Sequence, residues 1–164
     1  MSPTPRPRRA ATALVSAVAA ASLMLFAPDH ASAGVPTTSG TYAWETADPA
    51  HVAAINAAYS MIGTPYLAGG NTPKGFDCSG LVQWSFAQAG ITLPRDSRGQ
   101  QAFGFEIGSH ALRPGDLVFW GSPVYHAAIY VGDDMVIHSP RPGRTVHVAE
   151  MKWMGTPSSY GRIK

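Results

Sequence analysis

Hydrophobic and polar residues recur with two different periods along the chain, helical before about residue 103 and alternating after it. Asp48 followed by Pro49 is typical of a helix start and predicts a helix over residues 50–62. Apolar residues return at helical spacing over 78–89, which predicts a second helix. The N-terminal half of the folded region is therefore expected to be helical.

Glycines and prolines mark the ends of these helices. Gly63 and Gly90 follow the two predicted helices directly, as glycines after a helix C-terminus often do. The segment 64–75 holds two prolines and three glycines, which predicts a loop or a short irregular strand. Residues 97–103 predict a short helix, interrupted by Gly99.

Alternating apolar and polar residues predict a sheet in the C-terminal half. The expected strands, separated by Gly, Pro and Asp turns, cover 117–120, 126–131, 135–138, 145–149 and 158–163. Helices that precede a run of strands indicate an α+β domain with an antiparallel sheet of about five strands.

The first 33 residues have the composition of a secretory signal peptide. They contain Arg6, Arg8 and Arg9, an apolar stretch over 10–26, and the small residues Ala31-Ser32-Ala33. A retained membrane anchor is the alternative, but the apolar stretch is rich in alanine and shorter than the roughly 20 residues of a spanning helix. We expect cleavage after Ala33, with both the Sec and the twin-arginine routes open.

Cleavage would change the charge of the chain. The whole sequence carries 12 basic and 10 acidic residues, a net charge of +2, whereas residues 34–164 carry equal numbers of each. We expect a flexible lead-in over 34–47 and one domain over 48–164. Without a basic cluster or a second apolar span, neither nucleic acid nor an integral membrane position is expected.

Cys78 is the single cysteine of the chain, so it cannot form an internal disulfide. A free thiol accompanied by histidines is a candidate nucleophile, and the alternative is a buried, inert cysteine. Its predicted place at a helix start favours the first interpretation. Unpaired N–H groups and the helix dipole are expected to lower the pKa of the thiol and to stabilise an oxyanion beside it.

His126 and His138 are a candidate pair in which one ring would contact the thiol as a base and the other would hold it in place. They lie at equal distances on either side of Gly132. A hairpin centred on this glycine would place them directly opposite each other, with β-carbons about 5 Å apart. A bulge would shift this register. Zinc bound by two histidines and the thiol is a weaker alternative.

Several ordered motifs resemble the NlpC/P60 cell-wall peptidases, which are papain-like cysteine enzymes. The resemblance covers about residues 56–148. Its motifs are Gly63-Thr64-Pro65-Tyr66, Gly69-Gly70, Phe76-Asp77-Cys78-Ser79-Gly80-Leu81-Val82, Leu93-Pro94-Arg95, Gln100, Pro114-Gly115-Asp116-Leu117-Val118-Phe119, His126 with Ile129-Tyr130-Val131-Gly132, and Ile137-His138-Ser139-Pro140.

The resemblance implies a papain-like fold and a set of site residues. Cys78 would be the nucleophile, His126 the general base and then acid, and His138 the third member. Tyr66 would help to bind the oxyanion. The remaining implied substrate contacts are Asp77, Ser79 and, more weakly, Arg95.

The same resemblance implies a secreted, wall-associated endopeptidase without metal or organic cofactor. Its expected partners are peptidoglycan stem peptides, cut at the link between γ-D-glutamate and diaminopimelate. Two alternatives stay open: a wall-binding module without catalysis, and an amidase or acyltransferase that acts on another cell-surface molecule.

Overall fold

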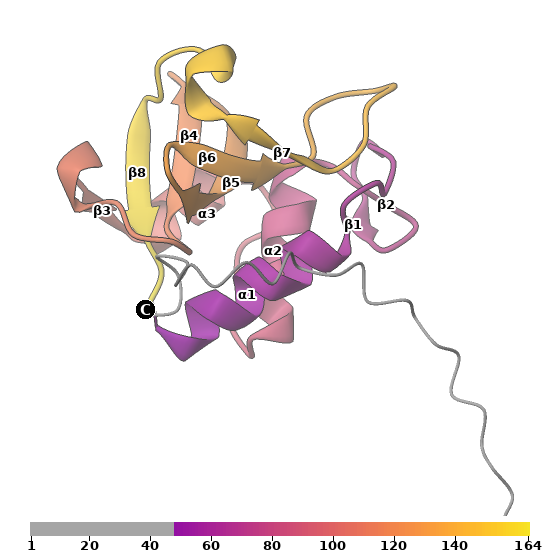
Figure 1. Ribbon diagram of the computed structural model, residues 1–164, viewed down its shortest axis with the longest axis horizontal. Coiled ribbons are helices and arrows are strands. Elements are labelled where there is room, and N and C mark those ends of the chain that lie inside the picture. The colour runs from indigo at the N-terminus through magenta and orange to yellow at the C-terminus, as the bar shows by residue number, and fades with distance from the viewer. Residues whose placement is uncertain (1–47) are drawn as a thin grey trace, which may run out of the picture. The chain divides into compact units, whose positions relative to one another are not determined.

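The computed structural model describes residues 48–164 (Figure 1). Its helices are α1 (Pro49–Ser60), α2 (Cys78–Gln88) and α3 (Ser97–Phe103), with short 3-10 turns η2 (Ser109–Ala111) and η3 (Met151–Met154). Its strands are β1 (Asn71–Thr72), β2 (Gly75–Phe76), β3 (Phe105–Ile107), β4 (Leu117–Gly121), β5 (Val124–Gly132), β6 (Met135–His138), β7 (His147–Glu150) and β8 (Ser159–Arg162). The predicted leader over 1–33 and lead-in over 34–47 lie outside the described residues.

The three predicted helices are present, and their caps explain where they begin. Asp48 accepts a hydrogen bond from the N–H of Ala50 at 2.8 Å, with Pro49 in the first turn of α1. In α3, Asp96 accepts from the N–H of Gly99 at 3.0 Å. The predicted interruption at Gly99 was wrong, because this glycine lies in the capped first turn.

Six strands form the main sheet, in the order β3-β8-β4-β5-β6-β7, and every neighbouring pair is antiparallel. The expected number was about five, because β3 was missed. This strand is short and pairs only with β8 at the edge of the sheet. β1 and β2 form a separate two-stranded ribbon inside the segment expected to be a loop or irregular strand.

Hydrophobic packing differs on the two faces of the sheet. Helices α1 and α2 pack against one face, where Leu81 and Phe86 of α2 meet Phe119 and Ile129 in a fully buried core. Figure 1 shows these two helices on the same side of the sheet. Burial of each such side chain contributes about 1.5–3 kcal/mol. α2, which begins at Cys78, is thereby held against the central strands.

A smaller cluster covers the other face. Val118, Trp120, Ala128 and Val136 are buried there beneath residues of η3 and β8. Within residues 48–164, no helix is both long and apolar enough to cross a membrane.

An ion pair joins the start of β4 to the neighbouring strand β8. The fully buried carboxylate of Asp116 accepts from Nε and Nη2 of Arg162 on β8, both at 2.7 Å. A paired geometry of this kind is among the strong hydrogen bonds of proteins. Asp116 therefore has a structural function.

Candidate active site

Cys78 is the first residue of α2 and is half-buried. Its Sγ atom lies 3.9 Å from the carbonyl oxygen of Tyr125, the residue before His126 on β5. Gly80, in the first turn, has no room for a β-carbon, which would collide with the carbonyl of Gly70. The small residue at this position lets the loop before β1 approach the helix start that carries the thiol.

Asp77 anchors this helix start through both of its carboxylate oxygens. Oδ1 accepts from the N–H of Gly80 at 2.7 Å, and Nη1 and Nη2 of Arg95 donate to Oδ1 and Oδ2 at 2.9 and 2.6 Å. Further donors are the N–H of Gly69 and the hydroxyl of Ser79. Burial raises the pKa of Asp77, but the Arg95 and backbone hydrogen bonds outweigh it and lower that pKa overall.

Arg95 and Ser79 therefore both form hydrogen bonds with other residues of the chain. Arg95 also donates to the hydroxyl of Ser79 at 3.1 Å and to the carbonyl of Gly70 at 3.2 Å. This geometry makes Arg95 a positioning residue for the Cys78 helix. Substrate contacts by Asp77, Ser79 and Arg95 stay predictions, and the hydrogen bonds above give them no direct support.

Two further polar residues hold the same region, and their functions were not identified from the sequence. The fully buried Gln100 donates from Nε2 to the carbonyls of Ser79 and Pro94 at 2.8 and 3.0 Å. The buried hydroxyl of Ser139 donates to the carbonyl of Phe76 at 2.7 Å. Both residues occur in the family motifs, and this was the only indication in the sequence that they have a function. Ser139 follows His138, so it links the histidine strand to the segment before Cys78.

His126 and His138 contact each other, although not in the predicted register. Nε2 of His126 lies 3.0 Å from Nδ1 of His138, and both side chains are buried. In the hairpin Ile129 pairs with Ile137, and the register shifts at Val131. Extension of this register places His138 across from Ala128. The expectation of directly opposed histidines was therefore wrong: they are diagonal neighbours on one face, and their rings span the gap.

The hydrogen bond between the two rings would determine where the protons lie if His126 has its predicted function as a base. If Nδ1 of His126 accepts the thiol proton, its Nε2 must carry a hydrogen and donate to Nδ1 of His138. His138 then carries its hydrogen on Nε2. That atom is buried and has no hydrogen-bond partner among residues 48–164. The edge of the His147 ring stacks against His138, with centroids 4.8 Å apart.

Burial favours the uncharged forms of the Cys78 thiol and of the two histidines. It raises the pKa of the Cys78 thiol, an effect that the N–H groups of Ala127, Ser79 and Cys78 reduce only in part. The pKa reduction expected from the helix start alone is thus outweighed. Burial lowers the pKa of His126 to about 4 and, with the neighbouring His126 and His147, that of His138 to about 3.

Tyr66 lies within electrostatic range of the thiol. Burial and the charges of Asp77 and Cys78 raise its pKa, so its hydroxyl stays protonated at neutral pH and can donate a hydrogen bond. This is consistent with the predicted oxyanion contact, which stays a prediction.

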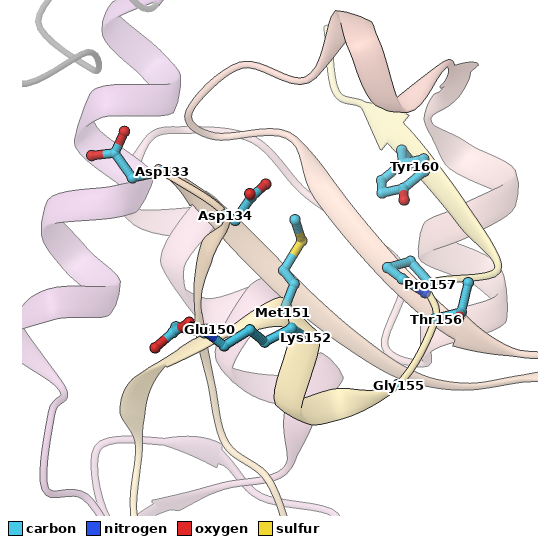
Figure 2. Close-up of a pocket in the computed structure, with 9 residues that line it drawn as sticks. All are labelled: Asp133, Asp134, Glu150, Met151, Lys152, Gly155, Thr156, Pro157 and Tyr160. Carbon is cyan, nitrogen blue, oxygen red and sulfur yellow. Dashed lines mark ion pairs between the residues drawn. The ribbon is translucent and has the colours of Figure 1, made fainter.

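A cavity of about 600 Å³ lies apart from these residues, against the β5–β6 turn, η3 and the start of β8 (Figure 2). Asp133 and Asp134 lie on one side of it and Tyr160 on the other, with Met151 between them. None of the predicted site residues lines it. In residues 48–164 no group of three or more His, Cys, Asp or Glu side chains is placed to hold a metal ion, so the zinc alternative gains no support.

The sequence profile of the NlpC/P60 family matches residues 63–160, which include Cys78, His126 and His138. The chain belongs to the NlpC/P60 family. This NlpC/P60 chain is 44% identical over 103 residues to a probable endopeptidase of Mycobacterium tuberculosis, covering 63% of the chain and 27% of the relative. It is 43% identical over 111 residues to the bifunctional muramidase/DL-endopeptidase CwlT of Bacillus subtilis, covering 62% and 33%.

Solved structures agree with this membership. The NlpC/p60 domain of the peptidoglycan hydrolase SagA superposes with a TM-score of 0.65 and 38% identity, covering 69% of this chain and 98% of that domain. The papain-like α+β fold is therefore confirmed. The chain spans only about a quarter to a third of the length of the two curated relatives.

Proposed function

We propose that this NlpC/P60 domain is a secreted cysteine endopeptidase that hydrolyses amide bonds in peptidoglycan stem peptides. The observation that carries the proposal is the 3.0 Å contact between His126 on β5 and His138 on β6, next to the Tyr125 carbonyl of β5, which lies beside the Cys78 thiol. This arrangement offers a nucleophile, a base and a partner that orients the base. The names of the relatives supply the substrate class.

The chemistry proceeds through an acyl-enzyme. His126 takes the thiol proton as the Cys78 sulfur attacks the carbonyl carbon, and the resulting oxyanion is stabilised by N–H groups at the start of α2 and by the Tyr66 hydroxyl. The C–N bond then breaks, and His126 returns the proton to the leaving amine. Water, deprotonated by His126, adds to the thioester, and the thiol and the free acid are released.

The bond we favour is the link between γ-D-glutamate and diaminopimelate. One relative, from Bacillus cereus, is named gamma-D-glutamyl-L-lysine dipeptidyl-peptidase and is 37% identical over 111 residues. That name supports cleavage after γ-D-glutamate in this chain too. The residue preferred after γ-D-glutamate is tested by comparing the cleavage rates of muropeptides that have lysine or diaminopimelate at the third position.

Mass spectrometry of muropeptides incubated with the purified domain tests the whole proposal. We expect new fragments that end in D-glutamate, and their complete loss in Cys78→Ala with the circular dichroism spectrum unchanged. Undiminished cleavage by Cys78→Ala would contradict the mechanism. Binding to cell walls without cleavage by the unmodified domain would instead favour a binding module, and absence of both would favour another cell-surface substrate.

A further inference from the structure

A small cavity of about 270 Å³ lies on the loop between β6 and β7. It is lined by Gly143, Arg144, Thr145 and His147. This volume suits a single charged group rather than a length of peptide, since whole ligands occupy about 300–1,000 Å³. The sequence motifs assigned no function to its residues.

Backbone contacts place this cavity beside the candidate active site. The N–H of Tyr66 donates to the carbonyl of Arg144 at 2.9 Å, and Pro65 pairs with Thr145 in an antiparallel bridge. Tyr66 in turn lies within electrostatic range of Cys78. The loop that forms the cavity is therefore bonded directly to the segment that flanks the thiol.

A side-chain contact makes the same connection from the histidine side. The ring of His147 meets His138 edge-on, with centroids 4.8 Å apart. Nδ1 of His147 donates to the carbonyl of Thr145 at 2.7 Å, which holds the ring against the loop. A group bound in the cavity would thus lie next to the residues predicted to perform catalysis.

Arg144 supplies an uncommitted positive charge. Its side chain is exposed, and within residues 48–164 its guanidinium has no ion pair or hydrogen bond, unlike those of Arg95 and Arg162. The loop from 139 to 146 contains a second exposed arginine, Arg141, and no acidic residue. A planar guanidinium without a partner is suited to bind a carboxylate with two parallel hydrogen bonds.

We infer that Arg144 and this cavity form a subsite for a carboxylate group of the stem peptide. The inference rests on the proposed function, because it needs a peptide bound across Cys78. The carboxylate has two possible sources, the C-terminus of the stem or a free side-chain carboxylate. Binding there would position the peptide, so the subsite would act mainly on KM.

The test compares pairs of muropeptides that differ only by amidation of one carboxylate, first the terminal one and then that of the side chain. One of the two pairs will differ in the carboxylate that occupies the subsite. On the free-acid member of that pair, Arg144→Gln should raise KM and so lower kcat/KM about fivefold to tenfold. The same variant should change kcat/KM less than twofold on the amidated peptide. Arg141→Gln, a neighbouring exposed arginine outside the cavity, is the matched control.

The outcomes separate this inference from the proposed function. An equal effect of Arg144→Gln on the free and amidated members of both pairs would overturn the subsite. So would an equal loss in Arg141→Gln, which would indicate a general effect of charge. Failure of the unsubstituted domain to cleave any of the peptides would overturn the proposed function. Binding of the same peptide pairs to Cys78→Ala and to Cys78→Ala/Arg144→Gln then still tests the subsite, and equal affinities would reject it.

Discussion

The two sides of the candidate active site are held by different kinds of interaction. On the helix side, the Asp77 carboxylate accepts hydrogen bonds from Arg95, from the N–H of Gly80 in α2 and from the N–H of Gly69. On the strand side, His126 and His138 share one hydrogen bond, and in the part of the chain that the structure describes Nε2 of His138 has no partner. The start of the helix that carries Cys78 is thus held by a network of charges, whereas the two histidines are kept neutral mainly by burial and can change protonation.

The strand side should make stability depend strongly on pH. The pKa of His126 is about 4 and that of His138 about 3 in the folded protein, whereas an unfolded chain takes up these protons near pH 6.5. The unfolded state therefore binds more protons on acidification. We expect the free energy of unfolding to fall from pH 6.5 to pH 5, approaching about 1.4 kcal/mol per pH unit for each neutral histidine.

Urea denaturation followed by tryptophan fluorescence at several pH values measures this slope. His126→Gln removes one of the two titrating groups and should reduce the slope by about half. Asp77 does not contribute to the slope between pH 6.5 and pH 5. The pKa of its carboxyl is lowered from 3.8, so it titrates below this range. Identical slopes for the two proteins would show that burial of His126 does not control its protonation.

The helix side should respond to loss of charge rather than to mild acid. Asp77→Asn removes the ion pair with Arg95 and weakens the cap of α2. We expect the free energy of unfolding to fall by about 2 kcal/mol, since hydrogen bonds to charged groups are involved. We also expect kcat to fall about tenfold as the thiol loses its position. Thermal or urea denaturation and steady-state cleavage measure the two effects.

The exposed ion pair between Glu150 and Lys152 provides the matched control. Surface pairs of this kind contribute little, so Glu150→Gln should leave both stability and cleavage unchanged. If Asp77→Asn behaved like this control, the proposed positioning function of Asp77 and Arg95 would be wrong.

Local signals allowed the helix side to be predicted more completely than the strand side. The Asp48-Pro49 helix start and the glycine after α2 act over a few residues, and the structure has helices where they predicted them. The partnership between Asp77 and Arg95 joins residues far apart in the sequence. No local pattern indicated that Arg95 would bind Asp77 rather than a substrate.

The hairpin register depended on turn geometry that the sequence did not specify. Asp133 and Asp134 both adopt positive φ angles, of 50° and 57°, which are uncommon for residues other than glycine. The resulting two-residue turn leaves Val131 as an extra residue and shifts His138 relative to His126. The pattern predicted the correct face for both histidines but not their alignment. β3 escaped prediction because it is short and its partner β8 lies far away in sequence.

Ser139 provides the smallest and most specific test, because its buried hydroxyl joins the two sides through the Phe76 carbonyl. Ser139→Ala should lower the free energy of unfolding by about 1 kcal/mol, since that carbonyl keeps a second bond from the N–H of Leu67. Ser60→Ala is the control: its exposed hydroxyl donates to the carbonyl of Ala57 at 2.7 Å, and its removal should have little effect. If Ser139 couples the two sides, the Asp77→Asn/Ser139→Ala protein should depart from additivity by more than about 0.5 kcal/mol. Simple addition would mean that helix and strand are held independently, and that the hydroxyl only satisfies a buried carbonyl.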